Sequence, residues 1–150
     1  MIRYLSIAAL LAVGATVAYA QGVTGPAAIK ERQAAMKAVG GAAKDLTAMN
    51  KGEAPFDAAK AAAGFKVLEA NFGKAKGLFP DDSKTGETDA LPKAWVDKAD
   101  LAAKFDKAAA DAKAASSGSN DEAGFKDQFK KVVSNCGGCH KEYRKPQDKK

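Results

Sequence analysis

Hydrophobic and polar residues follow one another along most of this chain with the period of an amphipathic α-helix. Apolar side chains recur every three or four residues within about residues 26–50, 55–78 and 92–115, and again after 119. Breaks rich in Gly, Pro, Asp and Ser separate these stretches. The pattern therefore predicts four helices.

Each predicted helix has an apolar face, as packing into a core requires. Pro26 suits a first helical turn, and Ser119 with Glu122 forms an S-x-x-E capping box that predicts the start of the fourth helix. The face expected to be buried in the second helix carries Phe56, Ala59, Ala63, Val67 and Ala70, with Phe65, Leu68 and Phe72 beside it. In the fourth helix this face carries Phe125, Phe129, Val132, Val133 and Cys136.

The composition also favours helices over strands. Ala and Lys are abundant, whereas Ile, Val and Thr are scarce. Four amphipathic helices predict an all-α fold, a four-helix bundle. The link over residues 79–92 exceeds the roughly 2–8 residues that usually join bundle helices, and a loop of this length often covers a site.

The N-terminus resembles an export signal. An apolar run follows Arg3 and ends in Ala18-Tyr19-Ala20, an A-x-A cleavage pattern. These features predict a signal peptide over residues 1–20, with an uncleaved anchor as the alternative. The apolar run is shorter than the roughly 20 residues of a membrane span, so stable membrane insertion is not expected. Residues 21–150 then form one domain, in a bacterium a periplasmic one.

The charge narrows the range of partners. The chain carries a formal net charge of +6, which falls to +5 when Arg3 leaves with the predicted signal peptide. Lysines are spread along the chain, and no aromatic residues interleave with a basic cluster. Nucleic acid is therefore not an expected partner, whereas a mildly basic surface suits an acidic protein.

The stretch "SNCGGCH" contains both cysteines and the only histidine of the chain. Cys136, Cys139 and His140 form C-x-x-C-H, the attachment motif of c-type haem. Residues three apart project to the same side of a helix, so each thiol can add to one vinyl group while the imidazole reaches the iron. Gly137 and Gly138 leave room for the macrocycle. The motif predicts one covalent haem c per chain.

Other chemistries use closely spaced cysteines. An exported C-x-x-C pair is compatible with a disulfide or a thioredoxin-like redox centre, but such redox centres lie in α/β folds and no strand is predicted here. Structural zinc takes four ligands. The chain offers two Cys and one His, so a carboxylate would have to complete a zinc site.

A second histidine is not available for the sixth position of the iron, because His140 stands alone. Met1 leaves with the predicted signal peptide, so Met36 and Met49 remain, both on the first predicted helix. The sixth position is therefore filled by methionine or by no residue of the chain. Filling a gap in the core is the alternative role of Met36.

The segments "CGGCHKEYR", "ERQAAM" and "GLFPDDSKTGETDALPKAW" resemble the class II c-type cytochromes, that is, the cytochrome c prime group and its low-spin relatives. Most soluble c-type cytochromes carry C-x-x-C-H near the N-terminus, so a C-terminal motif is a specific signal. The resemblance covers essentially all of residues 21–150. It implies an antiparallel four-helix bundle that holds haem among its helices.

The resemblance also implies residue roles. The motif supplies the two thioether cysteines and the proximal ligand, Arg144 matches a basic residue near the proximal side, and Arg32 matches an arginine near a propionate. Met36 matches the residue over the distal face. In cytochrome c prime that residue does not bind and the iron is five-coordinate, whereas in the low-spin relatives a methionine ligates it. The family often forms homodimers through its first two helices.

Two functions are compatible with these expectations. The first is one-electron transfer, in which ligation by Met36 raises the reduction potential and Lys141 and Lys145 orient a transient acidic redox partner. The alternative is a five-coordinate protein that binds nitric oxide or carbon monoxide in a buffering or protective role. No acid–base pair is placed beside the motif, so an enzyme is not expected.

Overall fold

The computed structural model describes residues 23–147. The predicted signal peptide over residues 1–20 lies outside the described residues. Helices dominate the described part of the chain, in the order α1 (Gly25–Lys51), α2 (Ala58–Lys76), the 3-10 turn η1 (Asp81–Ser83), α3 (Lys93–Val96), α4 (Lys98–Gly118) and α5 (Glu122–Tyr143).

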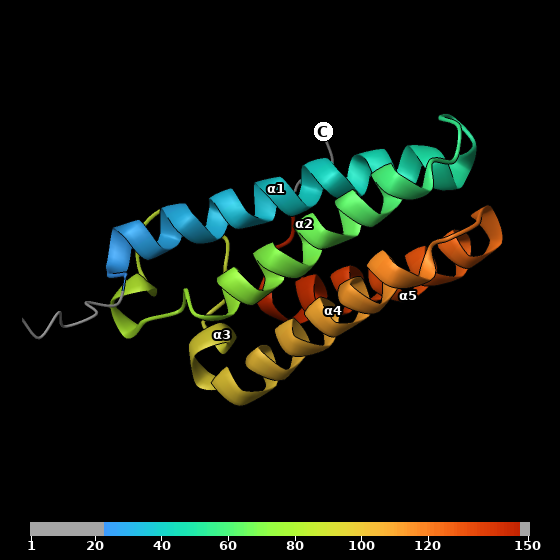
Figure 1. Ribbon diagram of the computed structural model, residues 1–150. Helices are drawn as coiled ribbons and strands as arrows, with labels where there is room; N and C mark the ends of the chain where they lie inside the picture. The colour runs from blue at the N-terminus through green and yellow to red at the C-terminus, as the bar shows by residue number, and fades with distance from the viewer. Residues whose placement is uncertain (1–22, 148–150) are drawn as a thin grey trace, which may run out of the picture.

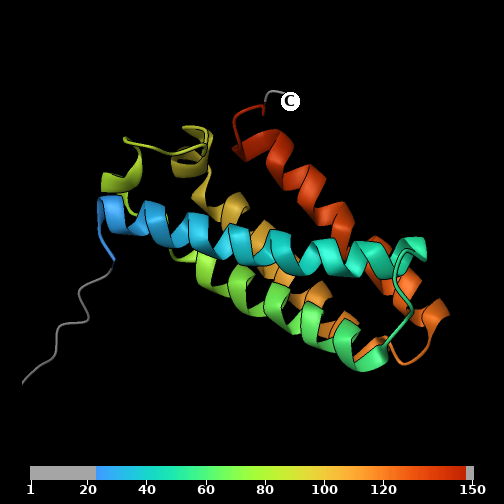
Figure 2. The same cartoon turned by 90° about the horizontal axis from the view of Figure 1, so that it is seen from above.

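The four long helices α1, α2, α4 and α5 form a bundle in which successive helices run in opposite directions (Figure 1). The α2–α4 pair is the most extensive contact, α1 packs on α2, and α5 packs on α4. By contrast, α1 and α5 touch at few points, and α5 diverges from α1 towards its C-terminal end (Figure 2). The predicted all-α four-helix bundle is confirmed.

The third predicted helix, over residues 92–115, is in fact two helices. The backbone leaves the helical region at Asp97 (φ −104°, ψ 49°), which separates the short α3 from α4. Trp95 on α3 is buried and its indole N–H donates to the carbonyl of Pro80 at 3.0 Å. The separate turn lets this side chain point inward beneath the preceding loop while α4 begins along another axis.

Two predicted helix starts are wrong. The capping box at Ser119 does not form, because Asp121 caps α5 by accepting from Gly124 N at 2.7 Å, while the Ser119 hydroxyl donates back to Ala115 O at 2.8 Å. At the start of α2, Asp57 is the N-cap, so this helix begins three residues later than predicted. In both cases an aspartate is the nearer acceptor for the free N–H groups.

The buried face of α2 also differs from the expected one. Ala59, Ala63, Val67 and Ala70 are exposed. Because α2 packs between α1 and α4, the face that these two neighbours share is the one that is buried. It carries Ala61, Phe65, Leu68, Phe72 and Ala75.

Candidate functional site: the C-terminal end of α5

The C-x-x-C-H motif lies in the last turns of α5, which is continuous from Glu122 to Tyr143. Cys136 and Cys139 are both half-buried, and neither is in a disulfide. Cys139 packs against the main apolar core, whereas His140 is exposed. The structure therefore brings these three predicted site residues together on one helix, as their spacing indicates.

Open space borders α5 between the two cysteines. A methyl group placed on Gly137 or Gly138 would meet no atom within 4 Å. Just beyond them is an open pocket of about 450 Å³, and its lining residues are Gly137, His140, Lys141, Arg144, Lys145, Pro146 and Gln147. A flat group can therefore approach this stretch of helix backbone without displacing protein atoms.

Desolvation sets the charge state of the donor atoms. Partial burial raises the pKa of the Cys136 thiol and that of the Cys139 thiol. Desolvation of the imidazole, reinforced by the positive charge of Arg144, lowers the pKa of His140. The histidine is thus favoured in its neutral form, the form that binds metal ions.

The donor set fits haem better than a bare metal ion. Within residues 23–147, no group of three or more His, Cys, Asp or Glu side chains is placed to hold a metal ion. The carboxylate that a zinc site would need is therefore absent from the motif end as described. A porphyrin supplies four nitrogen ligands itself, so the protein needs to provide only axial ligands. The exposed imidazole of His140 can provide one of them.

The two methionines of α1 occupy different positions. Met49 is 5% exposed and belongs to the core. Met36 is only half-buried and, like Cys139, packs against the main apolar core. Of the two candidates, Met36 is therefore the one whose side chain is not fully buried in the core.

Arg32 lies one turn before Met36 and is 6% exposed. Its guanidinium donates to Leu78 O, to Ser83 Oγ at 3.2 Å and to Thr88 Oγ1 at 2.9 Å. It also stacks 4.5 Å from the ring centre of Phe79. All three acceptors are neutral, and desolvation lowers the pKa of Arg32. The structure therefore places Arg32 beneath the long loop after α2.

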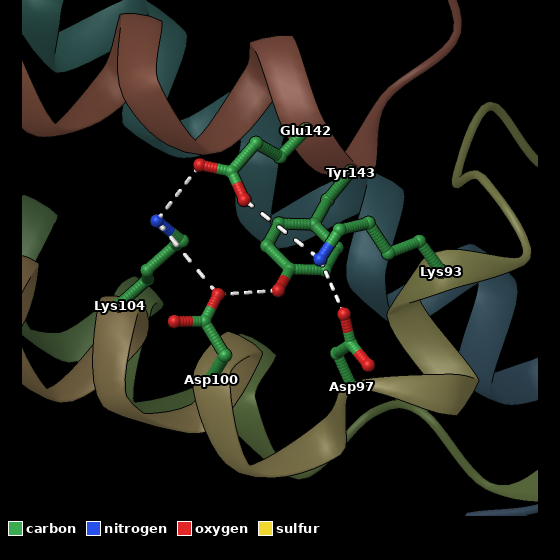
Figure 3. A network of polar contacts seen from close by, with 6 residues as sticks. All are labelled: Lys93, Asp97, Asp100, Lys104, Glu142 and Tyr143. Carbon is green, nitrogen blue, oxygen red and sulfur yellow. Dashed lines mark hydrogen bonds and ion pairs between the residues drawn. The ribbon is translucent and has the colours of Figure 1, made fainter.

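A polar network that the sequence did not reveal ties the end of α5 to α3 and α4 (Figure 3). The buried Tyr143 donates its hydroxyl to Asp100, and Lys104 bridges Asp100 at 3.7 Å and Glu142 at 3.1 Å. The Lys93 ammonium lies 4.9 Å from the ring centre of Tyr143. The i,i+4 pairs Lys93–Asp97 and Asp100–Lys104 had a sequence signal; the contacts to Glu142 and Tyr143 of α5 had none.

The chain leaving α5 pairs with the same long loop that covers Arg32. Leu91 N donates to Tyr143 O and Lys145 N donates to Asp89 O, each at 2.8 Å, and Ala90 and Arg144 form an isolated antiparallel bridge. Arg144 itself is half-buried beside His140. The long link therefore contacts the chain directly after the motif helix.

Comparison with known proteins identifies the fold and the motif together. Residues 27–144 match the family described as Cytochrome C′. The cytochrome c′ of Rhodopseudomonas palustris is 41% identical over 144 residues, which cover 95% of this chain and 96% of the relative. A solved structure of cytochrome c′ from Rhodopseudomonas palustris superimposes with a TM-score of 0.78 at 42% identity, covering 81% of this chain and 98% of that one. The chain belongs to the cytochrome c′ family.

Two further similarities show the range of this family. Cytochrome c-556 of Agrobacterium fabrum is 36% identical over 117 residues, which cover 77% of this chain and 80% of the relative. A nitric oxide complex of a variant cytochrome c prime from Alcaligenes xylosoxidans superimposes with a TM-score of 0.70 at 30% identity, covering 79% of this chain and 94% of that one.

Family membership decides the broad chemistry. The protein is a c-type cytochrome whose cofactor is covalent haem c. Like its family, it is a haem-binding carrier protein rather than an enzyme. Among residues 23–147, no helix is both long and apolar enough to cross a membrane.

Proposed function

We propose that this cytochrome carries single electrons through one haem c attached at Cys136 and Cys139, with His140 as the proximal ligand. Each thiol S–H would add across one vinyl group of the porphyrin to form a thioether. Three observations support these positions: the thiols are free, they lie on one helix turn, and the backbone between them faces open space. When bound, the haem supplies a ferric–ferrous couple.

We propose Met36 as the sixth ligand. The observation that supports it is its half-buried position against the same apolar core that Cys139 contacts. Thioether ligation raises the reduction potential relative to an open site. In this proposal both iron ligands would come from helices, His140 from α5 and Met36 from α1.

Two arginines are proposed to face the cofactor. Arg144 lies beside His140 in the open pocket, where its charge favours the neutral imidazole. The buried Arg32 has three neutral acceptors and no carboxylate among its described partners. A haem propionate is a suitable counterion for such a cation, because a buried charge is otherwise costly.

The partners and location are also proposals. The exposed Lys141, at the rim of the pocket, is suited to orient an acidic redox protein in a transient contact. Lys145 is less suited to this role, because its ammonium donates to Thr88 O at 2.8 Å. We propose that residues 21–150 form the mature periplasmic domain after cleavage of the signal peptide, and that homodimers form through α1 and α2.

A second function remains the alternative. One solved relative, the Alcaligenes xylosoxidans variant, is a nitric oxide complex. If Met36 only fills space, the iron is five-coordinate and open to nitric oxide or carbon monoxide. The role of the protein would then be to bind gas.

Spectroscopy of the holoprotein with two matched variants tests the assignment. Met36→Leu should convert a low-spin ferric spectrum into a high-spin one and make carbon monoxide binding to the reduced protein prompt. Met49→Leu is the control, because it removes a buried methionine of the same helix and should leave the spectrum unchanged. A high-spin wild-type spectrum that Met36→Leu does not alter would establish the gas-binding alternative instead. Intact mass tests attachment, since bare polypeptide from a maturation-competent host would refute it.

A further inference from the structure

The segment between α2 and α3 (residues 77–92, here the α2–α3 connector) contacts the two helices that carry the proposed axial ligands. On one side it receives the three hydrogen bonds of Arg32, which lies on α1. On the other it pairs with residues 143–145 at the end of α5. These are the ends of α1 and α5 that otherwise lie apart (Figure 2).

Thr88 is where the two sets of contacts meet. Its hydroxyl oxygen accepts from Arg32 Nη2 at 2.9 Å, and its backbone carbonyl accepts from Lys145 Nζ at 2.8 Å. The same hydroxyl oxygen accepts from Ala90 N at 3.2 Å, next to the bridge with Arg144. Thr88 is 8% exposed, and its bond with Arg32 is buried, whereas its bonds with Lys145 and Ala90 are partly buried.

We call the contacts of Thr88 with Arg32 and Lys145 the Thr88 joint. Further contacts hold the rest of the connector in place around this joint. Ser83 is fully buried and its hydroxyl donates to Pro80 O at 2.8 Å while accepting from Arg32. Gly86 takes a left-handed turn at φ 105°, where a side chain would strain the backbone. Gln33 donates to Glu87 O at 2.8 Å, adding a second contact from α1.

We propose that Thr88 is a positioning residue that sets the distance between α1 and the C-terminal end of α5, and thereby holds Met36 within reach of the iron. The inference rests on the proposed function for its last step. Met36 follows Arg32 by four residues, one turn along a continuous helix, and Arg144 follows His140 by four residues at the end of the other. Loss of the contacts at Thr88 should therefore let α1, which carries Met36, move relative to the end of α5, which carries His140.

The test compares Thr88→Val with Thr88→Ser in the holoprotein. Valine keeps the shape and removes the acceptor, whereas serine keeps the hydroxyl. Thr88→Val should raise amide hydrogen exchange in residues 77–92 and in the last turn of α5, and should speed carbon monoxide association with the reduced protein about tenfold, the effect of losing one hydrogen bond to a charged donor. Thr88→Ser should stay close to wild type in both measurements.

Hydrogen exchange separates this proposal from the ligation of Met36. If the wild-type iron is already open, carbon monoxide rates will not respond, but faster exchange at both the connector and the end of α5 will still support the joint. Wild-type exchange in a folded Thr88→Val protein overturns it. Should that variant fail to fold, Lys145→Met removes the contact from the α5 side at an exposed position. Raised exchange in the connector then supports the proposal, and unchanged exchange overturns it.

Discussion

The two halves of α5 differ in what holds them. In the N-terminal half, Phe125 and Val132 are fully buried, and Phe125 packs against the rings of Phe56, Phe65 and Phe129 with centroids 5.5–6.0 Å apart. In the C-terminal half the helix diverges from α1, and polar contacts at its last residues tie it to α3, α4 and the connector.

This difference indicates that the two halves of α5 have different roles: the N-terminal half stabilises the fold, and the C-terminal half presents the haem-attachment motif. Burial of apolar surface is the main favourable term in folding, and the N-terminal half of α5 concentrates it in its aromatic residues. The C-terminal half leaves its backbone open between the two cysteines and relies on directional polar contacts for its position. Such contacts keep the motif in place while leaving a surface that a large flat group can cover.

Phe125→Ala tests the packed half and should have the largest effect. Removing a fully buried ring from this cluster should lower the free energy of unfolding by about 3–5 kcal/mol, measured by chemical denaturation of the holoprotein. Val133→Ala, at a position 40% exposed, is the control and should change stability by less than about 0.5 kcal/mol. Comparable losses for the two variants would contradict the contrast between the halves.

Gly137→Ala tests the open half and should have an intermediate effect. Replacing glycine with alanine inside an exposed helix usually stabilises it by about 0.5–1 kcal/mol. Gly73→Ala in α2, where an added methyl group also meets no atom within 4 Å, should show this gain in the holoprotein. Gly137→Ala should not, because the methyl group would meet the haem. Equal stabilisation of both variants, by denaturation, would show that the macrocycle lies elsewhere.

Acid should weaken the polar contacts of the C-terminal half of α5. We expect this to be the smallest of the three effects on stability. The hydrogen bond from Tyr143 is the main reason that the pKa of Asp100 lies below its usual 3.8. A depressed carboxyl pKa stabilises the folded state above pH 3.8, and this contribution is lost as the pH falls through the lower, folded-state value. The stability difference between wild type and Tyr143→Phe should therefore shrink between pH 6 and pH 3. A difference independent of pH would refute this role of Asp100.

Local patterns were enough to predict the bundle and the motif. Hydrophobic periodicity depends only on neighbouring residues, so the long helices were found, and the C-x-x-C-H spacing placed Cys136, Cys139 and His140 on one helix. The same reasoning failed where the register depends on neighbours in space. The buried face of α2 follows from its packing between two helices, and the break at Asp97 follows from burial of Trp95 under the connector.

The sequence by itself determined the helical class, the attachment motif and the two methionine candidates. Each of these depends only on which residue types occur and on their spacing over a few positions. Only the tertiary structure decided that Arg32 binds the connector, that Thr88 contacts both Arg32 of α1 and Lys145 after α5, and that Met49 is buried whereas Met36 is only half-buried. The hydrogen bonds of Arg32 and Lys145 with the connector join residues that are 46–57 positions apart in the sequence. Their geometry follows from how the helices pack, which no local pattern encodes.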